Sequence, residues 1–467
     1  MVDMRIAQSG SIAGLHEQPI KPFPTQRIKD HRLAWKSIQS RLSRLGGGRE
    51  LSALIDQALV SGANFITNII LARALGINDF GVFALAWTAV LFVSSLQMAF
   101  IIAPMMSVGP KQEPHERPQY FGSLLVQEIG FSLFCSTAVL AVALIANAYF
   151  PRWNVRGLVL PLAFATLAYL LQDFIRRYFF SIRRSKLALA SDGISYLTQL
   201  PIILAIEHRP HFSAAAALWV IAATSLVGFL VSCIWFEPVQ LRAKSFKEVF
   251  IRHWNISRWL APSAFMQWSS GNLFALAAPL YYGPAATGIL RAAQNIVGVT
   301  HIWYLGLDNI VPAEAARRMH SKGLDAVFGY IKQILWRWGA ITFVFLAVIA
   351  LFPSLWLNLA YGTKYAPYGY ILRLYAVMYF MVFFGNPMRA GLQALEYTAP
   401  VFWSYLAMTV FALAFAGPFA KHLGLIGVML GLIGIQVIFQ GILAVALIVR
   451  VRRMRHNLLA ANQNMVL

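Results

Sequence analysis

The chain has 467 residues, of which 58% are hydrophobic and only 12% are charged, and its mean hydropathy is +0.61. Soluble domains carry roughly 25% charged residues, so these proportions exclude a water-soluble enzyme of about three domains. In a soluble protein the formal charge of +21 would suggest a nucleic-acid partner. Cys135 and Cys233 each lie inside a long apolar run, which excludes a disulfide framework.

Residues 1–50 form a polar, basic extension without the apolar segment and cleavage site of a signal peptide. Residues 1–30 hold no periodic apolar stripe, so we expect them to be disordered. A short amphipathic helix is predicted after them, because four apolar side chains share one face: Trp35, Ile38, Leu42 and Leu45.

From Leu51 to Val449, apolar segments of about 20 residues recur, each long enough to cross a hydrocarbon core of about 30 Å. Backbone groups in lipid must be satisfied within the segment, so the segments are predicted to be helices and the fold all-α. The predicted spans are 51–75, 80–108, 121–147, 157–180, 187–206, 213–236, 258–281, 285–311, 335–352, 370–390, 398–420 and 424–449.

Basic residues are distributed unevenly between the two sides of this polytopic chain. With the N-terminus in the cytoplasm, the inner segments contain 31 Lys and Arg and the outer segments 6. By the positive-inside rule, both termini are predicted to be cytoplasmic. Most of the positive charge is then an orientation signal, and we expect no nucleic-acid partner.

The linker 237–257 divides the spans into an N-lobe, 51–236, and a C-lobe, 258–449, followed by a basic cytoplasmic tail, 450–467. A weak repeat pairs Ser61-Gly62 with Ser270-Gly271, and Gly76 and Gly81 with Gly283 and Gly288 at the same five-residue spacing. We therefore predict about 12 transmembrane helices in two six-helix lobes, related by a pseudo-two-fold axis along the membrane normal, with the substrate cavity between them.

Three connecting segments are apolar enough to contact the membrane surface. The linker stripe is Phe246, Val249, Phe250 and Trp254, and a similar stripe before span nine is Leu324, Val327, Phe328 and Ile331. Both are predicted to be amphipathic helices on the membrane, although solvated linkers are the alternative. The external connection 353–369 carries an expected aromatic belt of Trp356, Tyr361, Tyr365 and Tyr368.

Ionisable residues inside spans cost roughly 2.5 to 3.5 kcal/mol on insertion, so deep ones are candidates for function. Asp56, Asp173, Asp192 and Asp308 lie near predicted cytoplasmic ends, where Arg partners can satisfy them; Arg176 and Arg177 stand at helical pairing distance from Asp173. Glu128 lies deeper, in span three. It is a candidate H⁺ or Na⁺ coupling site, and a satisfied buried or interfacial carboxylate is the alternative.

Arginines and amides suggest a cationic, amide-lined cavity, since a guanidinium can donate two hydrogen bonds at once to a phosphate. The alternative is that each Arg extends to the interface and each Asn bonds a neighbouring helix. The substrate-binding candidates are Arg291, Arg373, Arg73, His301, Asn64, Asn68, Asn272 and Asn295.

Chemistry that an enzyme would need is absent from the sequence. No G-x-x-x-x-G-K-[ST] phosphate loop and no H-E-x-x-H motif occurs, and Cys and His residues are scattered. We predict no catalytic residue, no cofactor and no metal site. A membrane glycosyltransferase, polymerase or ligase is a weaker alternative than transport, because the loops are short.

Several loose motifs carry a resemblance to a family. They are Asp56-Gln57, Ser61-Gly62, Asn64-Phe65, Leu71-Ala72-Arg73-Ala74-Leu75-Gly76, Phe80-Gly81, Gln172-Asp173-Phe174-Ile175-Arg176-Arg177, Leu290-Arg291-Ala292-Ala293-Gln294-Asn295 and Leu307-Asp308-Asn309. Together, over residues 51–449, they resemble the Wzx-type polysaccharide-biosynthesis flippases of the multidrug/oligosaccharidyl-lipid/polysaccharide exporter superfamily.

The resemblance implies alternating access that carries an undecaprenyl-diphosphate-linked oligosaccharide across the bacterial inner membrane, for O-antigen, capsule or exopolysaccharide synthesis. It also implies H⁺ or Na⁺ as a coupling ion, and a polysaccharide polymerase or export machinery as a partner. An ion-coupled drug or metabolite exporter of the same superfamily is the alternative. The basic extension 1–50 departs from the compact start that the family leads us to expect.

Overall fold

A computed structural model describes residues 48–466, with side chains from Ser52 to Met454 except those of residues 53, 54, 309, 313 and 322. The extension that contains the predicted helix of Trp35 to Leu45 lies outside these residues. Ser52–Leu467 forms one compact unit. Every regular element among the described residues is helical, which confirms the all-α prediction.

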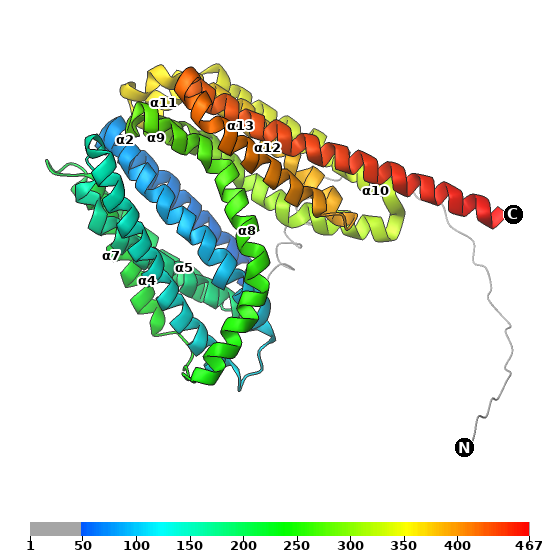
Figure 1. The fold of residues 1–467 in the computed structure, drawn as a ribbon, viewed down its shortest axis with the longest axis horizontal. Helices are drawn as coiled ribbons and strands as arrows, with labels where there is room; N and C mark the ends of the chain where they lie inside the picture. The colour runs from blue at the N-terminus through cyan, green and yellow to red at the C-terminus, as the bar shows by residue number, and fades with distance from the viewer. Residues whose placement is uncertain (1–47, 467) are drawn as a thin grey trace, which may run out of the picture. The chain divides into compact units, whose positions relative to one another are not determined.

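The N-lobe contains the first six spans, and external and cytoplasmic sides are named below by the predicted orientation. Helix α5 packs against α4, α6 and α7, and Figure 1 shows α4, α5 and α7 side by side. Its elements are α2 (Gly48–Gln97), the π-helix η1 (Met98–Ile102), α3 (Ala103–Val108), α4 (Arg117–Tyr149), α5 (Val159–Ser181), α6 (Ser185–Ile206) and α7 (Ala214–Cys233).

The C-lobe contains the other six spans. Helix α12 packs against α10 and α13, and these three helices lie together in Figure 1. Its elements are α8 (Ala243–Tyr282), α9 (Pro284–Val297), α10 (His301–Leu351), α11 (Pro353–Tyr361), α12 (Gly369–Ala394) and α13 (Ala399–Val466).

Three long helices each contain a glycine with a positive φ, at Gly76, Gly323 and Gly424, where the chain turns between two spans. Eight helical segments are long and apolar enough to cross a membrane, and two of them, Ile55–Lys111 and Ala399–Met454, have room for two crossings. Helix α8 and the stretch from α9 to Gly323 supply the remaining two. These two spans contain the amides Gln267, Asn272, Gln294 and Asn295, which lower their hydropathy. The described residues thus contain the twelve predicted spans.

The glycine repeat is a structural symmetry of the two lobes. Gly76 and Gly283 have nearly the same backbone angles, φ 73° with ψ −179° and φ 72° with ψ 177°. A Cβ added to Gly81 would lie 1.9 Å from the carbonyl oxygen of Pro284, and one added to Gly288 would lie 2.3 Å from that of Ile77. Each glycine therefore packs against the residue that follows the other lobe's turn.

This reciprocal contact, the external seam, sets the register of the repeat. Within it, Gly76 corresponds to Gly283 and Gly81 to Gly288. The predicted match of Ser61-Gly62 with Ser270-Gly271 is offset by two residues from this register. Serine and glycine recur often in packed membrane helices, so a dipeptide alone does not fix a register. The seam holds the external ends of the N-lobe and C-lobe together.

The predicted surface helices have different outcomes. Helix α8 begins at Ala243 and continues unbroken into span seven; Val249 is buried while Phe250 and Trp254 are about half exposed, as expected of an amphipathic helix. The prediction that the stripe from Leu324 to Ile331 lies on the membrane surface was wrong, because Leu324, Val327 and Ile331 are buried inside the protein. The cause is the turn at Gly323, after which α10 packs along α12.

The cytoplasmic end of the N-lobe holds the start of α8. The Tyr120 hydroxyl and the His253 ring Nε2 are 2.9 Å apart, and Ser257 Oγ donates to the Phe100 carbonyl at 3.1 Å. Val249 joins an apolar cluster with Phe121, whose other members come from η1 and from α3 to α7 of the N-lobe. Span seven of the C-lobe therefore begins on a helix that is anchored to the N-lobe.

Replacing Gly81 by Ala tests the external seam. The new Cβ needs about 1 Å more room than the 1.9 Å gap to the Pro284 carbonyl provides, so we expect the external ends to separate. The measurement is maleimide labelling of Thr287→Cys, a position that is 7% exposed, in purified protein from which Cys135 and Cys233 have been removed. Labelling should rise several-fold in Gly81→Ala.

The matched control is Gly130→Ala in α4, where an added Cβ meets nothing within 4 Å. Equal labelling of Thr287→Cys in the Gly81 and Gly130 variants would show that the seam does not hold the lobes together.

Candidate functional site

Arg291 lies on α9 among aromatic side chains of the C-lobe. It is half-buried, and its NH1 donates to Gln294 Oε1 at 3.1 Å. Tyr361, Tyr375 and Tyr379 are close enough to contribute to its electrostatic environment. No carboxylate of a described residue pairs with it. A guanidinium has five N–H donors, so Arg291 retains donors for an anion.

Two further predicted residues join the same group. Asn295 Nδ2 donates to the Tyr361 hydroxyl at 3.0 Å and to the Phe65 carbonyl of α2 at 3.4 Å. His301 Nε2 lies 3.3 Å from the Tyr379 hydroxyl. The structure therefore brings together what we call the C-lobe cationic cluster, which consists of Arg291, Gln294, Asn295, His301, Tyr361, Tyr375 and Tyr379.

Tyr361 and Tyr365 correct the predicted aromatic belt. They are 3% and 1% exposed, because the connection is not an open loop: Pro353–Tyr361 forms the helix α11 and Thr363–Tyr368 the 3-10 helix η6, and these turn the rings inward. Tyr365 donates to the Ala72 carbonyl at 3.3 Å, and Tyr361 accepts from Asn295. The belt prediction overlooked that a connection can fold back into the space between spans.

Arg73 and Arg373 lie at helix ends. Arg73 Nε donates to the Ala360 carbonyl at 2.7 Å and its NH2 to the Leu359 carbonyl, both in the last turn of α11. Arg373 Nε donates to the Ala350 carbonyl at 3.0 Å, in the last turn of α10. Cations favour such carbonyls through the helix dipole. Neither arginine hydrogen-bonds to the C-lobe cationic cluster in the part of the chain that the structure describes.

The remaining predicted amides have local partners. Asn68 Nδ2 donates to the Asn64 carbonyl at 2.8 Å, and both residues line a small polar cavity in the N-lobe. There Gln199 Nε2 donates to Thr67 Oγ1 at 3.2 Å. Asn272 Nδ2 donates at 2.8 Å to the Trp268 carbonyl of its own helix. The site candidates thus fall into separate groups, and only the C-lobe group combines a cation with amides.

Glu128 is fully buried within the N-lobe, 0% exposed. Its Oε1 accepts from Gln97 Nε2 at 2.7 Å and from Ser132 Oγ at 2.6 Å. Its Oε2 and the Gln97 Oε1 have no hydrogen-bond partner among the described residues. Gln97 directly precedes the π-helix η1, and such elements are frequent at functional sites. Sequence reasoning missed Gln97, whose only signal was an amide within span two.

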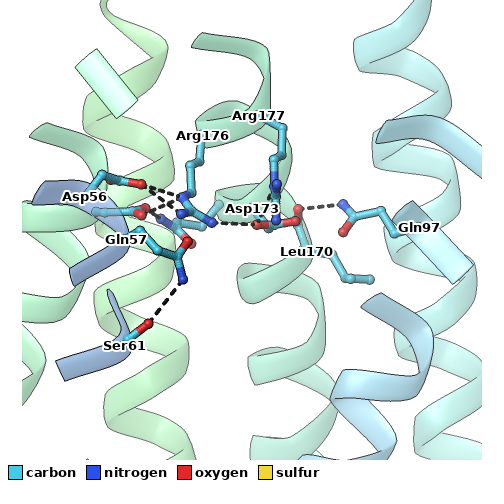
Figure 2. Close-up of polar contacts among 10 residues, drawn as sticks. Asp56, Gln57, Ser61, Gln97, Leu170, Asp173, Arg176 and Arg177 are labelled. Carbon is cyan, nitrogen blue, oxygen red and sulfur yellow. Dashed lines mark hydrogen bonds and ion pairs between the residues drawn. The ribbon is translucent and has the colours of Figure 1, made fainter. Parts of the chain in front are cut away.

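A second buried group, the Arg176 hub, joins three N-lobe helices (Figure 2). Arg176 lies 2.8 Å from Asp56 Oδ2 of α2, 2.6 Å from Asp192 Oδ2 of α6 and 3.6 Å from Asp173 Oδ1 of α5. Arg177 Nε lies 3.4 Å from the same Asp173 oxygen. The helical pairing of Asp173 with both arginines is confirmed.

The hub contains one more carboxylate than guanidinium group. Sequence analysis missed that Asp56 and Asp192 converge on Arg176, although all lie at similar predicted depth near the cytoplasmic ends of spans one, four and five. The fourth aspartate behaves in the same way, since Asp308 Oδ2 lies 2.9 Å from Arg389 NH2. These aspartates are thus paired within the lobes, as expected of structural carboxylates.

Comparison with solved structures shows which proteins have a similar fold. An inward-facing multidrug resistance MATE family transporter of the MOP superfamily is similar at TM-score 0.69 and 12% identity, over 87% of this chain and 96% of that one. The outward-facing conformation of a multidrug resistance MATE family transporter is similar at TM-score 0.56 and 14% identity, over 87% of this chain and 95% of that one. A MOP superfamily transporter from Pyrococcus furiosus is similar at TM-score 0.59 and 13% identity, over 87% of this chain and 94% of that one.

No protein-family model and no curated protein matches the sequence. The chain thus has the fold of MOP superfamily transporters, with twelve transmembrane helices in two lobes, and it is a multi-pass membrane protein. At these identities the likeness concerns the fold alone.

Replacing Arg176 by Met tests the hub. Removing the cation leaves Asp56 and Asp192 buried without a counter-charge, which typically costs about 3–5 kcal/mol. We expect a marked drop of the thermal unfolding midpoint in detergent, or loss of folded protein. Adding Asp56→Asn and Asp192→Asn to Arg176→Met should restore stability. Arg177→Met, which removes one 3.4 Å contact, is the matched control. Equal midpoints for the two Met variants would refute the hub.

Proposed function

We propose that the protein is a flippase that moves undecaprenyl-diphosphate-linked oligosaccharides across the bacterial inner membrane by alternating access, for surface polysaccharide synthesis. The observation that carries this proposal is Arg291, a half-buried cation without a carboxylate partner among the described residues. Charges in hydrocarbon are costly, so an uncompensated one indicates that an anion is its partner at some stage.

The groups around Arg291 suit the head of such a lipid. The guanidinium can hold phosphate oxygens through paired hydrogen bonds, which are strong in a site of low dielectric constant. Tyrosine rings and the Asn295 amide supply flat apolar surface and hydrogen bonds for sugars. The diphosphate and glycan cannot cross hydrocarbon unaided, whereas a polyprenyl tail can remain in lipid beside the lobes.

Alternating access requires the lobes to separate on one side at a time. The external seam closes one side, and Asn295 reaches the Phe65 carbonyl of the other lobe next to the cluster. An anion bound at Arg291 changes the electrostatics where the two lobes touch. We infer that cargo binding there biases the seam toward opening.

Glu128 is our proposed coupling site, with H⁺ as the favoured ion. Its Oε1 accepts two hydrogen bonds, while its Oε2 is buried and has no hydrogen-bond partner among the described residues. A proton on Oε2 therefore removes an uncompensated charge. Gln97 links this carboxylate to α5 through the Leu170 carbonyl at 2.8 Å. Protonation of Glu128 therefore changes hydrogen bonds that connect α2, α4 and α5.

A drug or metabolite exporter is the second candidate. The structures of similar fold include multidrug resistance transporters, and one MOP transporter is described as having a pocket of reversed polarity that suggests a different function. Cationic drugs call for exposed acidic groups, but the N-lobe aspartates here are engaged by Arg176. The cationic C-lobe cluster favours anionic cargo. In this proposal the termini are cytoplasmic, and a polysaccharide polymerase or export machinery receives the product.

Surface glycan in a strain that lacks the gene for this chain tests the proposed cargo. We expect the chain to restore the glycan and Arg291→Ala to reduce it at least several-fold with unchanged protein in the membrane, because the phosphate loses its charged partner. Arg291→Lys, which keeps charge without the planar fork, should be intermediate. Arg152→Ala, an exposed arginine in an external connection, is the control. Drug resistance without restored glycan would favour the exporter.

Glu128→Gln tests the coupling site. We expect infrared spectra of the protein in lipid to contain the C=O band of a protonated buried carboxyl, which weakens as the pH is raised and is missing from Glu128→Gln. Glu113→Gln, in an exposed connection, should leave the band unchanged. A band that persists in Glu128→Gln would assign the proton to another carboxyl.

A further inference from the structure

A large apolar cavity lies beside the first span, outside the C-lobe cationic cluster. Its volume is about 1050 Å³, and every residue that lines it is apolar or aromatic except Arg73. Ordinary small-molecule pockets have roughly 300–1,000 Å³, so the cavity is large for a compact ligand. We call it the outer groove; its walls include Phe65, Ile69, Arg73, Ile341, Val344 and Leu359.

The groove has the orientation of a lipid in the external leaflet. Phe65, Ile69 and Arg73 stand four residues apart on one face of α2, over about 12 Å, with Arg73 at the predicted external end. On α10 and α11 the opposite wall is exposed: Ile341 by 52% and Leu359 by 63%. Exposed apolar side chains in a span face acyl chains, so the groove opens sideways to the bilayer.

Both lobes contribute to the groove. Its α2 wall belongs to the N-lobe, and its other walls, among them Ile296 of α9, belong to the C-lobe. Ile296 follows Asn295, which bonds Tyr361 and the Phe65 carbonyl. The outer groove and the C-lobe cationic cluster thus share the wall formed by α9 and Phe65. A groove built this way changes shape whenever the lobes move.

Arg73 supplies charge at the external end. Two of its N–H groups donate to the carbonyls of Leu359 and Ala360, which fix the guanidinium in place. The other three N–H donors remain for a phosphate. The combination is an anchored cation at the water-facing end of a long apolar groove, which complements a phosphate attached to a long chain.

We propose that the outer groove is a lateral exit site for the flipped lipid, in which the isoprenoid chain lies along α2 and α10 and its phosphate lies beside Arg73. This rests on the proposed function, because the isoprenoid is the tail of that cargo. A bulk phospholipid has no reason to choose a groove that borders the head-group site and is formed by both lobes. An isoprenoid lipid released from the cluster meets this groove first.

Photo-crosslinking tests the exit site directly. The full chain, with p-benzoylphenylalanine at Ile341, is placed in phosphatidylethanolamine and phosphatidylglycerol vesicles that contain undecaprenyl phosphate. The matched control carries the same group at Leu413 of α13, which is 68% exposed and does not line the groove. We expect several-fold more capture of undecaprenyl phosphate at position 341, and we expect Arg73→Ala to lower it. Equal capture at both positions, or capture of phospholipid alone at 341, overturns the proposal.

A second pair of variants separates this inference from the proposed function. Val344→Trp fills the groove and should reduce glycan export several-fold, whereas Val410→Trp, on an exposed face of α13, should not. If the unaltered chain restores glycan but capture at 341 equals that at 413, the exit site fails and the flippase stands. If capture is selective but the chain never restores glycan, the groove stands as an isoprenoid site and the flippase fails.

Discussion

Hydrocarbon offers no solvent to a charged side chain, so every ionised group within these twelve spans must find its partner inside the protein. Arg176 meets this constraint with three carboxylates, and Arg73 and Arg373 meet it with helix-end carbonyls. Arg291 has no carboxylate partner among the described residues, and Glu128 has no cationic partner there. The two exceptions divide between the lobes, a cation in the C-lobe and a carboxylate in the N-lobe.

Much of the fold could be predicted from the sequence, because span length, hydropathy and loop charge each follow from the thickness and dielectric of a bilayer. The equal spacing of Gly76 and Gly81 and of Gly283 and Gly288 also indicated the symmetry of the two lobes. Only glycine allows both the positive φ at the turn and the close approach to the other lobe. The partner of each glycine could not be predicted, because a sequence does not state which turn faces which.

The site was predicted only in part, for a related reason. Arg291, Asn295 and His301 were identified from charge and depth, and the structure brings them together. Arg73 looked equivalent by the same criteria, yet it binds α11, a short helix that hydropathy alone presents as a loop. Depth along one helix was readable from the sequence, whereas convergence between distant helices, as at Arg176, depends on packing.

Helix α8 gives the two lobes a shared mechanical part. Its first turns are tied to the N-lobe through Tyr120 and Phe100, and its later turns are span seven of the C-lobe. No loop intervenes, but Pro262 interrupts the helical hydrogen bonds between these two parts. When the lobes rock against each other, α8 must therefore bend near Pro262. The bending stiffness of this one helix then limits how far the lobes rotate and couples the rotation of one lobe to that of the other.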